Sequence, residues 1–289
     1  MKGIILAGGS GTRLNPITVS VTKQLLPIYD KPMIYYPLCT LIEANIKEIL
    51  CICLDKDIDN FKQLLGDGSK WGLNIIYKIQ NEPNGIAEAF IIGSDFIKDD
   101  NVALILGDNI FYGINFDDSL IIDEKNFIGA KIFAYKVPDP QRYGVVEIIN
   151  NKVISIEEKP SNPKSNLVAT GLYFYDNSVV EISKKIKPSY RNELEITDVN
   201  REFLKSNKLD AIILKQGMVW LDAGTANSLL QASHYVQTIQ ERQSIQIGCP
   251  EELAFKKKLI SENEFEKLAI ESPKNSYGEY LRDIIKNYK

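Results

Sequence analysis

The residues that could do chemistry begin in the first turn of the chain. An apolar run of strand length, residues 3–7, opens into a glycine-rich loop from Gly8 to Gly11, and two cations, Arg13 and Lys23, follow. Glycine lets backbone N–H groups approach a ligand closely, and such groups beside fixed positive charges suit the acceptor oxygens of a polyphosphate. The stretch predicts a phosphate-binding loop. A tight strand-to-helix turn without a ligand is the alternative.

This loop fits neither familiar nucleotide fingerprint. It lacks the Gly-Lys-Ser/Thr ending of a Walker A loop, and Leu14 stands where the dinucleotide fingerprint needs its third small residue. Thr12 and Arg13 directly after the loop, with Lys23 further on, favour a triphosphate. A nicotinamide oxidoreductase therefore remains only a weak alternative, for which NADH binding would be the evidence.

Two aspartates follow apolar runs. Asp108 comes after the five-residue run 102–106, and Asp222 comes after the short run 219–221. Mg²⁺ usually takes one or two protein carboxylates and completes its shell with water and substrate oxygens. Asp108 and Asp222 are predicted to hold one Mg²⁺ from two sides. The competing interpretation makes each aspartate a helix N-cap, with the second helix beginning near Thr225.

A carboxylate next to an ammonium ends a further strand, at Glu158 and Lys159 before Pro160. A carboxylate can accept two sugar hydroxyls, while a lysine holds a phosphate as a point charge. A surface charge pair is the alternative. Gln80, after another strand, and the pair 143–144 are further candidates for contacts to a base and a sugar.

The composition excludes several classes of protein. The 289 residues include 34 basic and 38 acidic side chains, and the net charge of −4 with a pI near 5.3 disfavours a nucleic-acid partner. No apolar run approaches the roughly 20 residues that span a bilayer. Met1 and Lys2 lead straight into a strand without a signal-peptide cleavage site, so we expect a cytoplasmic protein.

The cysteines and the histidine provide few candidates for metal binding or catalysis. Cys39, Cys51, Cys53 and Cys249 are too scattered for a zinc ribbon and are predicted to be small buried hydrophobes. One histidine, His234, cannot build a multi-histidine metal site, and a catalytic role for it is a minor alternative. Chemistry must come mainly from carboxylates, lysine, arginine, backbone groups and a hard cation.

Alternating strands and helices position these groups. Strands are predicted at residues 3–7, 48–53, 73–79 and 102–106, and helices at 33–44, 58–65 and 85–97. This alternation indicates a parallel sheet with helices on both faces, and such sheets bind ligands at the carboxyl ends of their strands. The glycine loop and Asp108 both lie at such ends.

The pattern changes after residue 130. Strands at 132–135, 144–149, 153–157 and 168–175 predict a second, antiparallel or mixed, sheet region. Helices at 178–186, 195–206 and 226–240, strands at 209–214 and 219–221, and a charged helical segment from about 241 complete the chain. Lys256 to Lys258 are expected on a solvated helix face, with a regulatory phosphate site as the alternative.

The predicted fold class is therefore α/β: a Rossmann-like mixed, mostly parallel central sheet with helices on both faces, a smaller sheet region and a C-terminal helical segment. Residues 1–240 are expected to form the catalytic domain, with a nucleotide half at about 1–130 and a sugar-phosphate half at about 131–240. Residues 241–289 are expected to pack on it as a helical extension.

Eight stretches together resemble bacterial glucose-1-phosphate thymidylyltransferases of the sugar nucleotidyltransferase family. They are residues 8–14, 23–27, 31–37, 106–113, 142–146, 157–160, 170–175 and 193–198. The resemblance runs from Lys2 to about Tyr280, so it is more specific than any single motif.

The resemblance implies a Mg²⁺-dependent enzyme that joins dTTP and α-D-glucose 1-phosphate into dTDP-glucose and releases pyrophosphate, on the way to dTDP-L-rhamnose and related sugars. It also implies a homotetramer with a second nucleotide site at a subunit interface. Lys256 stands there in place of the arginine of many relatives, and it cannot reproduce a bidentate guanidinium contact.

The resemblance also implies the role of each site residue. Arg13, Lys23 and Lys159 would be the catalytic cations. The triphosphate would lie among Gly8, Gly11, Thr12, Arg13 and Lys23, with Gln24 as a further substrate contact. Gln80 and Gly85 would bind the thymine, and Asp108 and Asp222 would hold the metal. The sugar phosphate would lie among Tyr143, Gly144, Glu158 and Lys159.

Two rivals remain open. A uridylyltransferase making UDP-glucose differs in its substrate by one base methyl and the ribose 2′-hydroxyl. A non-catalytic nucleotide-sugar sensor would keep the fold and turn nothing over, although so many charged groups of a reacting site argue against it.

Overall fold

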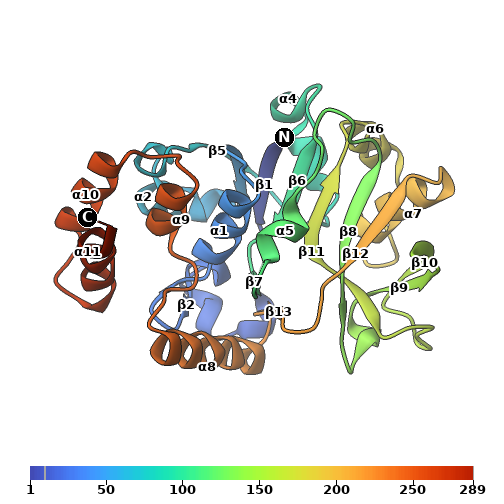
Figure 1. Ribbon diagram of the computed structural model, residues 1–289. Helices are drawn as coiled ribbons and strands as arrows, with labels where there is room; N and C mark the ends of the chain where they lie inside the picture. Colours follow the sequence, from blue (N-terminus) through green and yellow to red (C-terminus); the bar gives the residue numbers. More distant parts are fainter. Residues whose placement is uncertain (10, 289) are drawn as a thin grey trace.

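The computed structural model describes residues 1–9 and 11–288 (Figure 1). Ser10, in the middle of the glycine loop, lies outside the described residues. Nine strands form the central sheet: β1 (Lys2–Ala7), β4 (Glu48–Cys53), β5 (Asn74–Ile79), β6 (Val102–Leu106), β8 (Ala130–Lys136), β9 (Gly144–Ile149), β10 (Lys152–Glu158), β11 (Leu167–Tyr175) and β12 (Leu209–Ile213).

The sheet has a parallel part and a part organised by β11. The strand order is β10-β9-β11-β6-β1-β4-β5, and β8 joins β11 to β12. β1 is parallel to β4 and β6, whereas β11 is antiparallel to β6, β8 and β9. The region after residue 130 contains the expected antiparallel strands, but it continues the central sheet through the β11–β6 pairing.

The apolar runs form strands because both faces of the sheet are covered. Ile5 and Ala7 of β1 point into one core, and Ile4 and Leu6 point into another. The first core contains residues of α1 (Tyr35–Glu43), α2 (Ile58–Leu65), α5 (Phe116–Leu120), α9 (Pro250–Lys256), α10 (Glu262–Glu271) and α11 (Ser276–Tyr288). The second contains residues of α3 (Glu88–Ile92), α4 (Ser94–Ile97), α6 (Ser178–Lys185) and α7 (Ile196–Lys205). Helices on both faces are thus confirmed.

The helix predicted over residues 85–97 is wrong in extent. It begins only at Glu88, and Gly93 divides it into α3 and α4. A Cβ on Gly93 would lie 2.9 Å from Ala89 O and 3.1 Å from Ile4 Cδ1, so the helix breaks where the backbone packs closely against β1. Glycine also disfavours a helix interior.

Two small sheets lie outside the central one. β2 (Pro27–Ile28) pairs with β3 (Lys31–Pro32), and β7 (Asn109–Tyr112) pairs with β13 (Val219–Asp222). β7 was not predicted, because its apolar residues directly follow a turn and are too few to form a pattern. The β7–β13 pair brings Asp222 beside the end of β6, and α8 (Ala226–Gln243) packs near it.

The C-terminal helices pack on the first core rather than at the carboxyl ends of the strands. Figure 1 shows α10 and α11 at one end of the molecule and β9 and β10 at the other. Trp71 Nε1 donates a 3.1 Å hydrogen bond to Glu251, and Lys31 Nζ donates one of 2.6 Å to Gln246, so α9 and the segment before it are tied to the N-terminal half. Lys256 is exposed and pairs with Glu252 at 2.6 Å.

The prediction of buried cysteines is confirmed. All four cysteines are buried and none forms a disulfide. In residues 1–9 and 11–288, no helix has both the length and the apolar character needed to cross a membrane.

The fold places one carboxyl group in an unfavourable setting. Burial of Glu43, at the end of α1, and the nearby charge of Asp117 raise the pKa of Glu43 to about 7, although Lys257 and Lys256 oppose this. The folded state therefore holds the proton more tightly than the unfolded chain. The contribution of protonated Glu43 to the free energy of unfolding is therefore fully present below the ordinary pKa of 4.5, and it is lost as the pH rises through about 7.

The variant Glu43→Gln stays neutral at every pH. We expect its free energy of unfolding, relative to that of the wild type, to be higher at pH 8 than at pH 5, as measured by urea denaturation. Glu48→Gln, at an exposed position of β4, is the control and should show no such pH dependence. An equal difference at both pH values for Glu43→Gln would contradict the assignment.

Candidate active site

Two adjoining cavities lie where the parallel strands end. The glycine-loop cavity, of about 570 Å³, contains most of the residues predicted for the phosphate loop and the base: Gly11, Thr12, Arg13, Lys23, Gln80 and Gly85. The aspartate cavity, of about 500 Å³, contains those predicted for the metal and the sugar phosphate: Asp108, Tyr143, Gly144, Glu158, Lys159 and Asp222. Arg13, Lys159 and Arg191 line both cavities. The structure thus brings these segments, distant in sequence, into one cleft.

The glycine loop lies closely against the end of β5. A Cβ on Gly8 would be 2.1 Å from Oε1 of Gln80, whose Nε2 donates a 2.7 Å hydrogen bond to Glu88. Gly11 has φ of +65°, and Thr18 Oγ1 donates a 2.8 Å hydrogen bond to its carbonyl oxygen. Gln80 is only 2% exposed, so its side chain is held in a fixed position between the loop and α3.

Gln24, which is predicted to contact the substrate, is buried near the end of β6. It is 2% exposed, accepts a hydrogen bond from Thr22 at 3.2 Å, and lies so close to Gly107 that a Cβ there would be 2.8 Å from its Cγ. It is not among the residues that line either cavity. His234 is exposed on α8 and does not line them either.

Asp108 ends β6 as a buried carboxylate. Burial opposes its ionisation, but the Lys23 ammonium, which forms an ion pair with Oδ2, and hydrogen bonds from Asn109 and the backbone together lower the pKa of Asp108. Asn109 Nδ2 donates a 3.0 Å hydrogen bond to Oδ1. The chain continues from Asp108 into β7, not into a helix, so the N-cap alternative does not hold for this residue.

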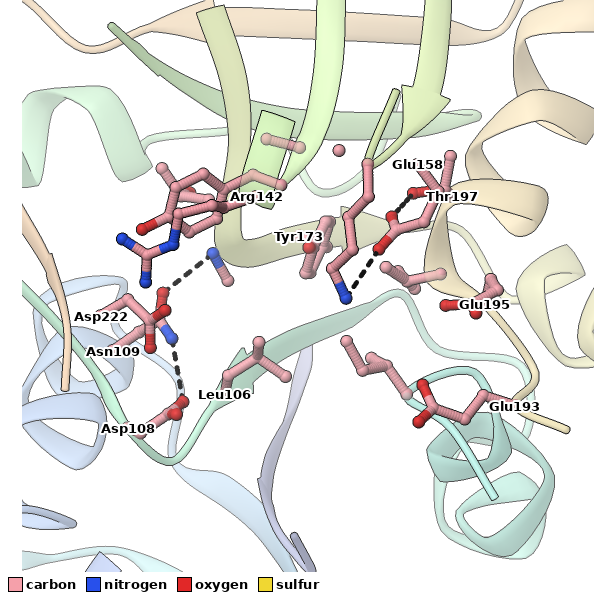
Figure 2. Close-up of a pocket in the computed structure, with 18 of the residues that line it drawn as sticks. Leu106, Asp108, Asn109, Arg142, Glu158, Tyr173, Glu193, Glu195, Thr197 and Asp222 are labelled. Atoms are coloured by element: carbon pink, nitrogen blue, oxygen red, sulfur yellow. Dashed lines mark hydrogen bonds and ion pairs between the residues drawn. The ribbon is translucent and has the colours of Figure 1, made fainter. Parts of the chain in front are cut away.

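Asp222 lies opposite Asn109 in the β7–β13 ladder. Burial and the nearby charge of Asp108 raise the pKa of Asp222 to about 6, while Lys23, Arg13 and other cations oppose the shift. Asp222 does not cap α8 either, because Thr225 does so through a capping box with Ser228. Figure 2 shows Asp108 and Asp222 on the same side of the cavity.

These two carboxylates fit a magnesium ion. They are near enough for one charge to suppress ionisation of the other, which is the situation that a divalent cation relieves. Within residues 1–9 and 11–288, no cluster of three or more histidine, cysteine, aspartate or glutamate side chains is placed to bind a metal. Two aspartates are what Mg²⁺ needs if phosphate oxygens and water supply its other ligands.

Glu158 and Lys159 are not an isolated surface pair. Thr197 Oγ1 donates a 2.6 Å hydrogen bond to Glu158 Oε2, and Lys159 Nζ and Arg191 Nη2 each lie 3.5 Å from Glu158 Oε1. Figure 2 shows Glu158 and Thr197 pointing toward each other across the cavity from Asp108. The carboxylate therefore has a fixed orientation.

The sequence interpretation missed several residues that line the aspartate cavity. They are Asn109, Arg142, Arg191, Glu193, Glu195, Thr197 and Trp220. Arg191 is the most constrained, because its Nη2 donates to both oxygens of Glu195 at 2.8 and 2.7 Å. The available signal was the charged segment 191–195 between two helices, which contains an arginine and two glutamates.

The segment with Arg191 is joined by backbone to the loop with Gly85. Leu194 N donates a 2.6 Å hydrogen bond to Asn84 O, and Ala87 N donates a 3.1 Å one to Leu194 O. Gly85 has φ of +111°, and a Cβ there would lie 2.4 Å from Leu194 N. Only glycine fits this contact, which links the walls of the two cavities.

The donors and cations of the glycine-loop cavity adjoin the two aspartates, and Lys23 pairs with Asp108, an arrangement that suits a reaction between two phosphorylated substrates. The chain belongs to the nucleotidyl transferase family, whose model matches residues 2–239. Among individual proteins, it is 54% identical to glucose-1-phosphate thymidylyltransferase of Neisseria meningitidis serogroup A, over 99% of this chain and 100% of the relative. The resemblance predicted from the sequence is confirmed.

Solved structures of similar proteins have the same fold. A Bacillus anthracis protein described as a glucose-1-phosphate thymidylyltransferase in complex with a sucrose superposes with a TM-score of 0.76 and 41% identity, over 81% of this chain and 94% of that one. A UDP-glucose pyrophosphorylase complexed with UDP-glucose gives a TM-score of 0.72 over 82% of this chain and 98% of that one. Its identity is 24%, so it supports the fold alone.

The Gly85 contact predicts a stability difference between two glycine substitutions. Gly217 also has positive φ, of +93°, but a Cβ there would meet no atom within 4 Å. Both variants to alanine incur backbone strain of about 1–3 kcal/mol, and Gly85→Ala adds a clash with backbone atoms that no side-chain rotation relieves. We expect Gly85→Ala to lose at least about 1 kcal/mol more than Gly217→Ala in urea unfolding. Equal losses would show that the contact relaxes freely.

Proposed function

We propose that this chain joins dTTP and α-D-glucose 1-phosphate to give dTDP-glucose and pyrophosphate, as a glucose-1-phosphate thymidylyltransferase. The observation that carries the proposal is the meeting of Arg13, Lys23, Asp108, Lys159 and Asp222 in one cleft. They come from four separate segments of the chain, since Arg13 and Lys23 both follow the glycine loop. The identity of 54% to a relative of that name, over nearly the whole chain, supports the choice of substrates.

The reaction needs alignment more than proton transfer. The sugar phosphate is already an anion, so it attacks the α-phosphorus without a general base, and catalysis consists of positioning and charge neutralisation. Arg13 and Lys23 hold the triphosphate and stabilise the leaving pyrophosphate. Lys159 lines both cavities and holds the attacking phosphate between them. The exposed position of His234 is no handicap to such a mechanism.

Asp108 and Asp222 would hold Mg²⁺. When bound, the ion supplies Lewis acidity and neutralises charge on the phosphate oxygens. Lys23 already compensates Asp108 and lies in the glycine-loop cavity, so it is placed to exchange its carboxylate partner for a phosphate.

Glu158 would receive the sugar. Its carboxylate is oriented by Thr197 and faces Arg191, and a carboxylate so held accepts a pair of hydroxyls. Gln80 and Gly85 line the other cavity, where the thymine would lie. Tyr143 and Gly144 complete the sugar-phosphate side.

We further propose a cytoplasmic homotetramer that feeds dTDP-L-rhamnose or a related dTDP-sugar route, as the resemblance implies. Residues 1–240 would act as the catalytic domain and 241–289 as its helical extension. Lys256, which here pairs with Glu252, would give the interface nucleotide site a point charge instead of a guanidinium fork.

The metal assignment predicts the effect of one isosteric substitution. Asp108→Asn keeps the shape of the side chain but removes the charge that compensates Lys23 and binds Mg²⁺. We expect pyrophosphate release to fall on the order of 100- to 1,000-fold. Asp210→Asn, at an exposed position of β12, is the control and should match the wild type. Wild-type turnover by Asp108→Asn at saturating Mg²⁺ would refute the assignment.

The base assignment predicts the nucleotide preference. Burying the thymine methyl is worth about 0.8 kcal/mol, so dTTP should exceed UTP in kcat/KM by about fourfold or more. A panel of nucleoside triphosphates against sugar 1-phosphates measures this. A preference for UTP would identify a uridylyltransferase, and no turnover with any pair would favour the nucleotide-sugar sensor.

A further inference from the structure

Asn109 joins two walls of the aspartate cavity. It is the first residue of β7, directly after Asp108, and its side chain is 1% exposed. Its Oδ1 accepts hydrogen bonds from Trp220 Nε1 at 2.5 Å and from Gly171 N at 3.0 Å, while its Nδ2 donates to Asp108 Oδ1 at 3.0 Å. One amide thus contacts β13, β11 and the carboxylate at the end of β6.

This amide has one possible orientation. Two N–H donors point at Oδ1, so Oδ1 must be the acceptor and Nδ2 must face the carboxylate. Gly171 packs against it so closely that a Cβ would lie 2.5 Å from Oδ1 and 2.8 Å from Nδ2 of Asn109. The side chain is therefore fixed in position as well as in orientation.

Both partners of Asn109 belong to the cleft. Trp220 lines the aspartate cavity and packs edge-on against Tyr143, with ring centroids 5.2 Å apart. Gly171 lies where the register between β11 and β8 shifts, and it also lines the cavity. At the other end, Asn109 holds one oxygen of Asp108 while Lys23 pairs with the other. Figure 2 shows Asn109 beside Asp108 and Asp222.

We propose that Asn109 is a positioning residue that sets the carboxylate plane of Asp108 relative to the sugar-side wall formed by Trp220. It acts through Asp108 on the cation and through Trp220 on the sugar, so one side chain keeps the two halves of the site in register. Groups that orient a metal-binding carboxylate typically affect metal affinity or activity 10- to 100-fold. The inference rests on the proposed function for its kinetic consequences only.

The first test uses Asn109→Ala, which removes all three hydrogen bonds. We expect the Mg²⁺ concentration for half-maximal pyrophosphate release to rise about 10- to 100-fold and the KM for glucose 1-phosphate to rise as well. Asn109→Asp keeps both accepting contacts and loses only the donated one. Its kcat should fall, because two carboxylates then face each other, while its KM for glucose 1-phosphate stays near the wild-type value. An unchanged Mg²⁺ requirement in Asn109→Ala would overturn the proposal.

A second readout needs no turnover. The chain has two tryptophans, Trp71 and Trp220, so protein labelled with 5-fluorotryptophan gives two ¹⁹F signals. The signal that persists in the variant Trp71→Phe belongs to Trp220. That signal should shift in Asn109→Ala and stay in Asn109→Asp. Mn²⁺ added alone should broaden it, at a concentration 10- to 100-fold higher in Asn109→Ala than in the wild type. No shift, or no broadening in the wild type, would overturn the proposal.

Asn200→Ala is the matched control. Asn200 is also fully buried and accepts a 2.6 Å hydrogen bond from Tyr175, but it lines neither cavity. Asn200→Ala should lower thermal stability. It should leave unchanged the Mg²⁺ concentration for half-maximal pyrophosphate release and the Mn²⁺ concentration that broadens the ¹⁹F signal. If both concentrations rose as much as in Asn109→Ala, the effect of the Asn109 substitution would be merely structural and the proposal would fail. If the wild type turned over no substrate pair, the proposed function would fail, and the ¹⁹F experiment would still decide the role of Asn109.

Discussion

The buried charge of Asp108 is the constraint on which the cleft depends. A carboxylate removed from water must be paired and hydrogen-bonded, and removing one partner of such a pair typically costs about 3–5 kcal/mol. Lys23 supplies the opposite charge from the glycine-loop segment, and Asn109 supplies a hydrogen bond from β7. Compensating the charge of Asp108 therefore brings the N-terminal loop, β6 and the β7–β13 pair together. Asp222 lies near Asp108 because it is the last residue of β13.

The parts of this arrangement that could be predicted from the sequence are those with a local signal. Buried parallel strands read as continuous apolar runs, so β1, β4 and β6 were found close to their true ends, and the polar residues that follow them, Asp108 among them, were recognised as site candidates. Asp222 could be found in the same way, since it ends a short apolar run. Here the local pattern and the tertiary environment agree.

The parts that could not be predicted depend on long-range contacts. Nothing near Asn109 in sequence indicates that Trp220 and Gly171 meet it, because β7 acquires its partner from more than a hundred residues away. Arg191 lies in a segment that forms neither a helix nor a strand, and its pairing with Glu158 depends on a contact between residues 33 positions apart. Gly93 divides a helix at a point of close packing against Ile4 of β1, and a helical pattern does not record such a contact.

The contact of Gly85 with Leu194 has an evolutionary consequence. It makes the loop with Gly85 and the segment with Leu194 a single mechanical unit, since a shift of either one would break the backbone hydrogen bonds between them. An insertion or deletion in one segment would displace the other. A change of sugar specificity would therefore occur most readily by substitution of side chains on an unchanged backbone. The two cavities thus share one backbone geometry, and their lining side chains are the parts that can change without disturbing it.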